Sequence, residues 1–141
     1  MKQELVQDWM TREVITITPE TSLKEAHDIM NARGIRRLPV VLHGKVTGIL
    51  TLGDIRGAEP SKASSLSVWE MNYLLAKLQV GEIMTRNPAT IQQTANIGEA
   101  AQVMLEKKFS GLPVVDEEQH LVGIITESDI FRLVVTEWSK S

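Results

Sequence analysis

The sequence predicts an α/β protein made of two tandem repeats, each ordered strand, helix, strand, strand, helix. Three observations lead to this fold class. The run Met-Thr-Arg at residues 10–12 returns 74 residues later at 84–86. Between residues 6–41 and 80–115, 13 of 36 aligned positions are identical. Within each repeat, short β-rich runs flank a segment whose apolar residues recur at helical spacing. We therefore expect two similar units packed around a pseudo-two-fold axis, with clefts between them.

Each element of the first repeat has its own local signal. We expect a strand over residues 14–17, a helix from Ser22 to about Gly34, strands over 38–42 and 46–50, and a helix from Thr51. Ser22 and Glu25 have the spacing of a capping box, which opens a helix. Gly34 tolerates the left-handed conformation at a helix stop. His43 and Gly44 indicate a tight turn between the two apolar strands.

The second repeat follows the same order with two changes. Asn96 and Glu99 stand in place of the Ser/Glu pair that opens the first helix. The hairpin over residues 116–120 is longer and more acidic, so Gly123 aligns with Gly48 at an offset of 75. An insertion in a surface loop costs little free energy, and both copies are therefore expected to fold alike.

A segment outside the duplication joins the two repeats. Residues 57–65 are rich in small, polar and turn residues and predict a linker. Ser67 and Glu70 predict the start of a helix that runs through Leu78 with an apolar stripe. This helix either packs against the repeats of its own chain or forms a subunit interface. The predicted division of the chain is a first motif at 1–58, a linker and helix at 59–79, and a second motif with a C-terminal helix at 80–141.

The bulk composition narrows the functional class. The chain has 141 residues, of which 43% are hydrophobic, enough for a real core. A net charge of −3 and a pI of about 5.6 argue against a nucleic-acid partner. The lack of cysteine excludes disulfides and is compatible with a reducing compartment. No apolar run is long enough to span a bilayer, so we expect a cytoplasmic protein without a membrane partner.

The ordered anchors of both repeats resemble the CBS domain. Each copy has Met-Thr, a short strand, a capped helix, Leu-Pro-Val-Val, a hairpin, Gly-Ile and then Thr-x-x-Asp-Ile. The resemblance covers residues 6–56 and 80–132, so the chain resembles a tandem CBS pair, or Bateman module. The segment between the repeats looks like that of stand-alone bacterial and archaeal pairs related to acetoin-utilisation regulators. The resemblance implies a regulatory module that binds AMP, ADP, ATP or S-adenosylmethionine in clefts between the two motifs.

The resemblance also implies which residues line these clefts. Each cleft takes the Thr-x-x-Asp motif of one repeat, and the early strand and the residues before Leu-Pro-Val of the other. One cleft is expected to combine Thr126, Ser128 and Asp129 with Ile15, Thr16, Ile35, Arg36 and Arg37. The other is expected to combine Thr51, Gly53 and Asp54 with Ala89, Thr90, Phe109, Ser110 and Gly111.

The chemistry of these residues suits an adenosine ligand. An ionised aspartate accepts hydrogen bonds from both hydroxyls of a vicinal diol. A threonine at a helix N-terminus suits a phosphate, because the backbone amides there favour anions. The same four letters are also an ordinary helix cap, with threonine as N-cap and an acid in the first turn. The sequence leaves both roles open, and both can hold at once.

The two predicted clefts differ in charge. Arg36 and Arg37 in one cleft correspond to Ser110 and Gly111 in the other. Paired arginines bind a phosphate bidentately, so the cleft with Asp129 is expected to prefer phosphorylated ligands. The alternative is that both arginines are simply solvated at the surface.

The sequence offers no catalytic constellation. The three histidines are scattered over a helix and two hairpins, and no Ser-His-Asp set or glycine-rich phosphate loop can be argued from spacing. We therefore expect no enzyme activity, no metal site and no required cofactor. The favoured function is a ligand sensor that forms a homodimer and acts through an unidentified protein effector. The alternative is an interaction or assembly module whose clefts are vestigial.

Overall fold

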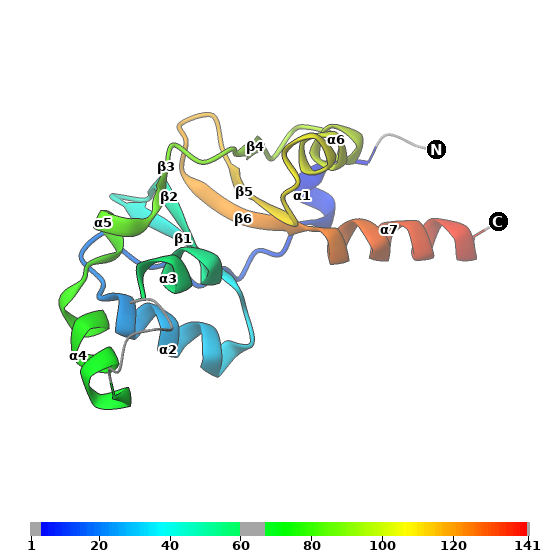
Figure 1. The fold of residues 1–141 in the computed structure, drawn as a ribbon. Helices are drawn as coiled ribbons and strands as arrows, with labels where there is room; N and C mark the ends of the chain where they lie inside the picture. The colour runs from blue at the N-terminus through cyan, green and yellow to red at the C-terminus, as the bar shows by residue number, and fades with distance from the viewer. Residues whose placement is uncertain (1–3, 60–66, 141) are drawn as a thin grey trace. The chain divides into compact units, whose positions relative to one another are not determined.

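The computed structural model describes residues 4–59 and 67–140, and the chain divides into two compact units. The first unit is Ile15–Pro88, and the second unit combines Met1–Val14 with Ala89–Ser141. Both units are mixed α/β, as the sequence predicts (Figure 1). The bounds of these units differ from those of the sequence repeats. The first segment of the first repeat belongs to the unit that holds most of the second repeat, and the first segment of the second repeat belongs to the unit that holds most of the first. The predicted motif boundaries and the pseudo-two-fold packing stay predictions.

The first unit carries one antiparallel sheet and four helices in the part that the structure describes. Its elements are α2 (Leu23–Arg33), β1 (Arg37–Leu42), β2 (Lys45–Thr51), α3 (Leu52–Ala58), α4 (Val68–Lys77), α5 (Val80–Ile83) and β3 (Thr85–Arg86). The sheet order is β1-β2-β3. The predicted start of α2 is confirmed, since Ser22 accepts the Glu25 N–H at 3.0 Å. The predicted helix stop is confirmed too, with Gly34 left-handed at φ 64°.

Two expectations for the first unit are wrong. The predicted strand over residues 14–17 shrinks to a single bridge, in which Ile17 donates to the Pro39 carbonyl at 3.1 Å. The pairing ends there because the Thr18 N–H donates to the Thr21 hydroxyl in a local turn. The predicted linker also begins too early, because α3 continues to Ala58. The remainder of that predicted linker, residues 60–65, lies outside the described residues.

The second unit repeats the design with one longer helix. Its elements are α1 (Val6–Trp9), β4 (Ile91–Gln92), α6 (Ile97–Lys107), β5 (Gly111–Val115), β6 (Leu121–Thr126) and α7 (Glu127–Ser139). The sheet order is β4-β5-β6, with β4 parallel to β5. Asn96 accepts the Glu99 N–H at 2.9 Å, which confirms the predicted start of α6. Lys108 ends α6 with φ 59° where the first repeat uses a glycine.

The Met-Thr segments are exchanged between the repeats. Met84 is buried against β2, and a Cβ added to Gly48 would lie 2.5 Å from the Met84 Sδ. Met10 is buried against β6 in the same way, and a Cβ on Gly123 would lie 2.7 Å from its Sδ. Each sheet thus needs a glycine where the exchanged methionine crosses it.

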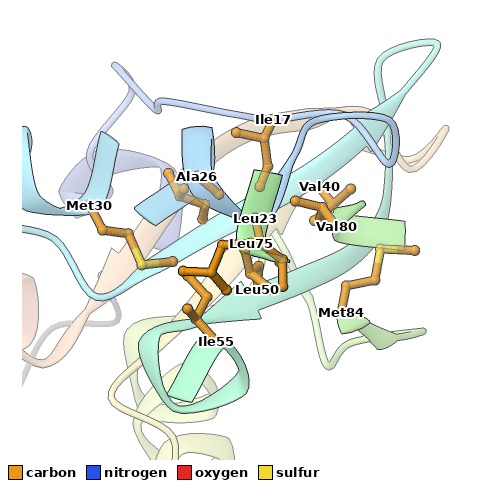
Figure 2. Close-up of a cluster of buried hydrophobic side chains, with 11 residues drawn as sticks. Ile17, Leu23, Ala26, Met30, Val40, Leu50, Ile55, Leu75, Val80 and Met84 are labelled. Atoms are coloured by element: carbon orange, nitrogen blue, oxygen red, sulfur yellow. The ribbon is translucent and has the colours of Figure 1, made fainter. Parts of the chain in front are cut away.

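Each unit has its own hydrophobic core. The first core gathers side chains from α2, α4, α5 and the sheet (Figure 2); its fully buried members include Leu23, Leu38, Leu50 and Ile55. Leu75 of α4 is 3% exposed in this core, which confirms that α4 packs within its own chain. The second core is built likewise, with Leu112, Val114, Ile125 and Leu133 at its centre.

Candidate functional site

Each unit has one place where a strand ends and a Thr-x-x-Asp motif opens a helix. At the first corner, Thr51 ends β2 and caps α3: its N–H donates to Asp54 Oδ2 at 2.9 Å, and the Asp54 N–H donates to Thr51 Oγ1 at 3.0 Å. At the second corner, Thr126 caps α7, and its N–H donates to Asp129 Oδ2 at 2.9 Å. Both motifs are therefore capping boxes, and the capping interpretation of the sequence is confirmed.

The two corners differ at the second carboxylate oxygen. Asp129 Oδ1 lies 3.4 Å from the Thr11 hydroxyl and 3.2 Å from Arg132 Nη2. Asp129 is only 2% exposed, the one buried charged residue of the described core. Asp54 is half-buried, and within residues 4–59 and 67–140 its Oδ1 has no hydrogen-bond or ionic partner. Both aspartates cap a helix, but only Asp54 keeps an oxygen available to a further donor.

The residues before Leu-Pro-Val lie beside the motif of their own repeat. The Arg36 carbonyl accepts the Leu52 N–H at 2.8 Å, and Arg37 faces Thr51 across the β1–β2 ladder. In the second unit, the Ser110 carbonyl accepts the Glu127 N–H at 3.1 Å. Gly111 faces Thr126 in the same manner. The structure thus brings the two arginines to the first corner, whereas their predicted pairing with Asp129 joins different units and stays a prediction.

The other predicted site residues border the two corners or the early strands. Gly53 and Ser128 are exposed in the first turns of α3 and α7. Ile15 and Ile35 pack on the edge of the first core, and Ala89 on that of the second. Thr16 is exposed, Thr90 is half-buried, and Phe109 is 44% exposed after α6. None of these residues makes a contact that by itself indicates a ligand.

Two partners of Asp129, Thr11 and Arg132, were not predicted from the sequence. Arg132 lies one helical turn after Asp129, a spacing at which side chains on a helix meet. Its counterpart after Asp54, at the repeat offset of 75, is Gly57. The presence of an arginine in one copy and a glycine in the other is the sequence signal that could have revealed the difference between the two carboxylates. Thr11 reaches Asp129 because the segment around Met10 packs on β6, and no local sequence pattern predicts that contact.

The described residues give little support to a metal site or a membrane-spanning helix. Within them, no three His, Cys, Asp or Glu side chains are grouped to hold a metal ion. His120 Nδ1 lies 3.5 Å from both Asp116 and Glu118 in the second hairpin. Among the described helices, none has the length and apolar character needed to cross a bilayer.

The chain belongs to the CBS domain family. The family's sequence profile matches twice, over residues 6–61 and 80–136. These matches contain both corners, so the Thr-x-x-Asp motifs are part of the family's own repeat.

Curated relatives place this pair of motifs in proteins of several kinds. Protein MJ1225 of Methanocaldococcus jannaschii is 33% identical over 93% of this chain, which spans 47% of that protein. An inosine-5'-monophosphate dehydrogenase of Korarchaeum cryptofilum is 34% identical over 89% of this chain, but the match covers only 23% of that enzyme. A CBS domain-containing protein of Dictyostelium discoideum is 36% identical, and this chain spans 91% of it.

Solved CBS pairs have the same fold. The CBS domain pair of protein MJ0100, in complex with 5'-methylthioadenosine and S-adenosyl-L-methionine, is 34% identical with a TM-score of 0.77, covering 96% of this chain and 99% of that one. CBSX2 of Arabidopsis thaliana in complex with AMP is 28% identical with a TM-score of 0.78, covering 94% and 97%. AcuB of Vibrio cholerae, linked by its description to acetoin utilization, is 29% identical with a TM-score of 0.79, covering 98% and 95%.

Proposed function

We propose that this chain is a regulatory module that binds an adenosine-containing ligand, namely AMP, ADP, ATP or S-adenosylmethionine, and performs no reaction of its own. The family and the ligands of the solved pairs support the ligand class. The observation that carries the proposal in this chain is the Asp54 carboxylate, whose Oδ1 has no partner among the described residues, at a corner where the backbones of Arg36 and Arg37 pair with those of Leu52 and Thr51.

The first corner offers complementary chemistry to a nucleotide. The open oxygen of Asp54 can accept hydrogen bonds from ribose hydroxyls, and charge-assisted bonds of this kind are about twice as strong as neutral ones. A guanidinium presents a planar fork that matches phosphate oxygens, which favours a phosphorylated ligand near the arginines. We therefore propose that the first corner is the stronger site, which reverses the order expected from the sequence. The other predicted lining residues are retained as proposed contacts.

Removing the Asp54 carboxylate tests this assignment. Asp54→Ala is expected to weaken AMP binding about 10- to 100-fold, because a lost charge-assisted hydrogen bond costs about 1.5–3 kcal/mol. Arg37→Ala is expected to weaken AMP binding while leaving adenosine binding nearly unchanged. Isothermal titration calorimetry measures both effects. Glu70→Ala is the matched control, since Glu70 is the acid of the capping box of α4 and lies in no proposed site.

The result also separates a sensor from an assembly module. A thermal-shift screen with AMP, ADP, ATP and S-adenosylmethionine should raise the melting temperature of the unmutated protein. A ligand at 100 times its dissociation constant adds about 2.7 kcal/mol of apparent stability. If no adenine compound binds at millimolar concentration, the assembly module with vestigial clefts replaces the sensor.

We propose that the protein forms a homodimer through α7. Four apolar side chains recur along this helix at helical spacing and are 43–80% exposed: Phe131, Val134, Val135 and Trp138. Aromatic side chains are enriched at subunit interfaces. Val135→Glu should therefore shift the mass measured by light scattering from dimer to monomer. The control Val68→Glu, on exposed α4, should leave the mass unchanged, and a monomer without any substitution contradicts the proposal.

We propose a cytoplasmic location and an effector protein that responds to the bound ligand. The cysteine-free sequence is compatible with a reducing compartment. Cell fractionation tests the location, and recovery in a membrane or secreted fraction would contradict it.

A further inference from the structure

We propose that Arg132 occupies the ribose-accepting oxygen of Asp129 and closes the second corner, so that, of the two motif aspartates, Asp54 alone keeps an open acceptor oxygen among the described residues. The inference rests on the proposed function, since it concerns which of two candidate sites an adenosine ligand can use. On this proposal, Arg132 is the reason why the two aspartates differ in their availability to a ligand. Arg132 is a positioning residue here, because it acts on the ligand through Asp129.

The hydrogen-bonding capacity of Asp129 is already used within its own unit. An ionised carboxylate has about four lone-pair sites. Oδ2 accepts from the Thr126 N–H at 2.9 Å and from the Thr126 hydroxyl at 3.2 Å. Oδ1 accepts from the Thr11 hydroxyl at 3.4 Å and from Arg132 at 3.2 Å. A ribose diol that brought two more donors would have to displace some of these groups.

Arg132 is held in place from a second side. Its Nη2 also donates to the Trp9 carbonyl at 3.0 Å, and its guanidinium carbon lies 5.9 Å from the centre of the Trp9 ring. Trp9 is itself fixed by Nε1, which donates to Glu4 at 3.2 Å. The arginine side chain is 56% exposed, but the Asp129 side chain that it meets is only 3% exposed. Arg132 therefore links α7 to α1 through the Trp9 carbonyl and, on its other side, pairs with the Asp129 carboxylate.

Among residues 4–59 and 67–140, no arginine pairs with the carboxylate of the first corner. Gly57 stands at the position that Arg132 holds in the second repeat. A Cβ added to Gly57 would meet nothing within 4 Å, so there is room for a side chain. Thr85, the counterpart of Thr11, makes no hydrogen bond to Asp54 in the described chain. The two corners share one capping box and differ by one arginine and one hydroxyl.

Reciprocal substitutions in the full chain test the proposal, with AMP as the probe in calorimetry. The unmutated protein should bind one AMP per chain, and Arg132→Ala should raise this number to two. The new site should require Asp129, so adding Asp129→Ala should remove it. Binding at the new site should weaken with 2′-deoxy-AMP, which lacks one ribose hydroxyl. Arg12→Ala is the control, since Arg12 donates to the Gln7 carbonyl at 3.0 Å and makes no other side-chain hydrogen bond or ion pair with a described residue.

The reverse change should close the first corner. Gly57→Arg should weaken AMP binding at least tenfold, whereas Gly57→Ala should leave it unchanged. This pair also carries the test if circular dichroism shows that Arg132→Ala is unfolded.

The possible failures are distinct. If the unmutated protein binds AMP and Arg132→Ala leaves the stoichiometry unchanged, this inference is wrong and the proposed function stands. If Arg132→Ala weakens AMP binding, Arg132 contacts the ligand directly and the inference is again wrong. If neither the unmutated protein nor folded Arg132→Ala binds any adenine compound, the proposed function and the inference fail together.

Discussion

The first and second corners start from the same four-residue motif and end with different carboxylates. In both, the threonine N–H donates to the aspartate at 2.9 Å, while the aspartate N–H donates back to the threonine hydroxyl at 3.0 Å in the first corner and 3.4 Å in the second. Asp129 is then buried under Thr11 and Arg132, while Asp54 stays half-buried with an open oxygen. The comparison teaches that duplication preserves the local helix start, whereas contacts from distant segments decide whether the carboxylate is available to a ligand.

The largest expected effect concerns stability. Asp129→Ala should lower the free energy of unfolding by about 2–3 kcal/mol, because it removes a buried carboxylate and leaves several donors without their partner. Asp54→Ala removes only the acid of a capping box, while the Thr51 cap remains, and should cost about 1 kcal/mol. Urea unfolding followed by circular dichroism measures both. Equal losses for the two variants would show that burial does not distinguish the two aspartates.

The exchanged methionines should show that the two sheets remain alike. Gly48→Ala and Gly123→Ala should each cost about 2 kcal/mol, since the new methyl group would collide with Met84 or Met10 in a packed core. The backbone carbonyls of Thr85 and Thr11 lie at 2.9 and 2.8 Å from the same two points, so the neighbours have little room to move. Thermal unfolding checks the pair. A larger loss of stability for Gly123→Ala than for Gly48→Ala would indicate that displacing Thr11 also weakens its hydrogen bond to Asp129.

A suitable control for this pair is Gly57→Ala. Its added methyl group meets nothing within 4 Å. Its melting temperature should therefore stay the same or rise slightly, because alanine favours the helix over glycine. A large loss there would mean that glycine substitutions destabilise this protein for reasons other than collision.

The smallest expected effect compares the two hairpins. The first turns tightly at His43 and Gly44, both with positive φ, whereas the second is closed by Asp116. The His120 N–H donates to that carboxylate at 2.9 Å and lowers the pKa of Asp116; the Glu118 N–H adds to the effect, while desolvation opposes it. A lowered pKa in the folded state means that this stabilisation is present at neutral pH and is lost as the pH falls through the folded pKa.

Asp116→Asn should therefore be slightly less stable than the unmutated protein at pH 7, and the difference should vanish in acid. Melting temperatures from pH 7 down to pH 3 give the comparison. A gap between the two proteins that widens on acidification would contradict the assigned sign. His43→Asn in the first hairpin is the control and should show no such loss below pH 4.

Much of the fold follows from local signals in the sequence. The Ser22 cap, the Gly34 stop and the capping boxes at Thr51 and Thr126 all form as predicted, because each depends on residues within one helical turn. The duplication itself showed that both copies share one order of elements. The prediction of a strand over residues 14–17 was wrong, since a short β-rich run needs a partner along its whole length and only Ile17 has one, opposite Val40.

The tertiary structure decided the long-range contacts. No spacing in the sequence shows that Met10 and Thr11 join the second unit. These neighbours are set by which strands pair, and strand pairing depends on the free energy of the whole core rather than on any single segment. By contrast, the predicted hairpin around His43 and Gly44 already brings Arg37 near Thr51. The sequence by itself determined the family, the helix caps and the two candidate aspartates. Only the folded chain decided that the Thr11 hydroxyl reaches Asp129 and that the Trp9 carbonyl anchors Arg132, because Trp9 and Thr11 come from a segment far away in the sequence.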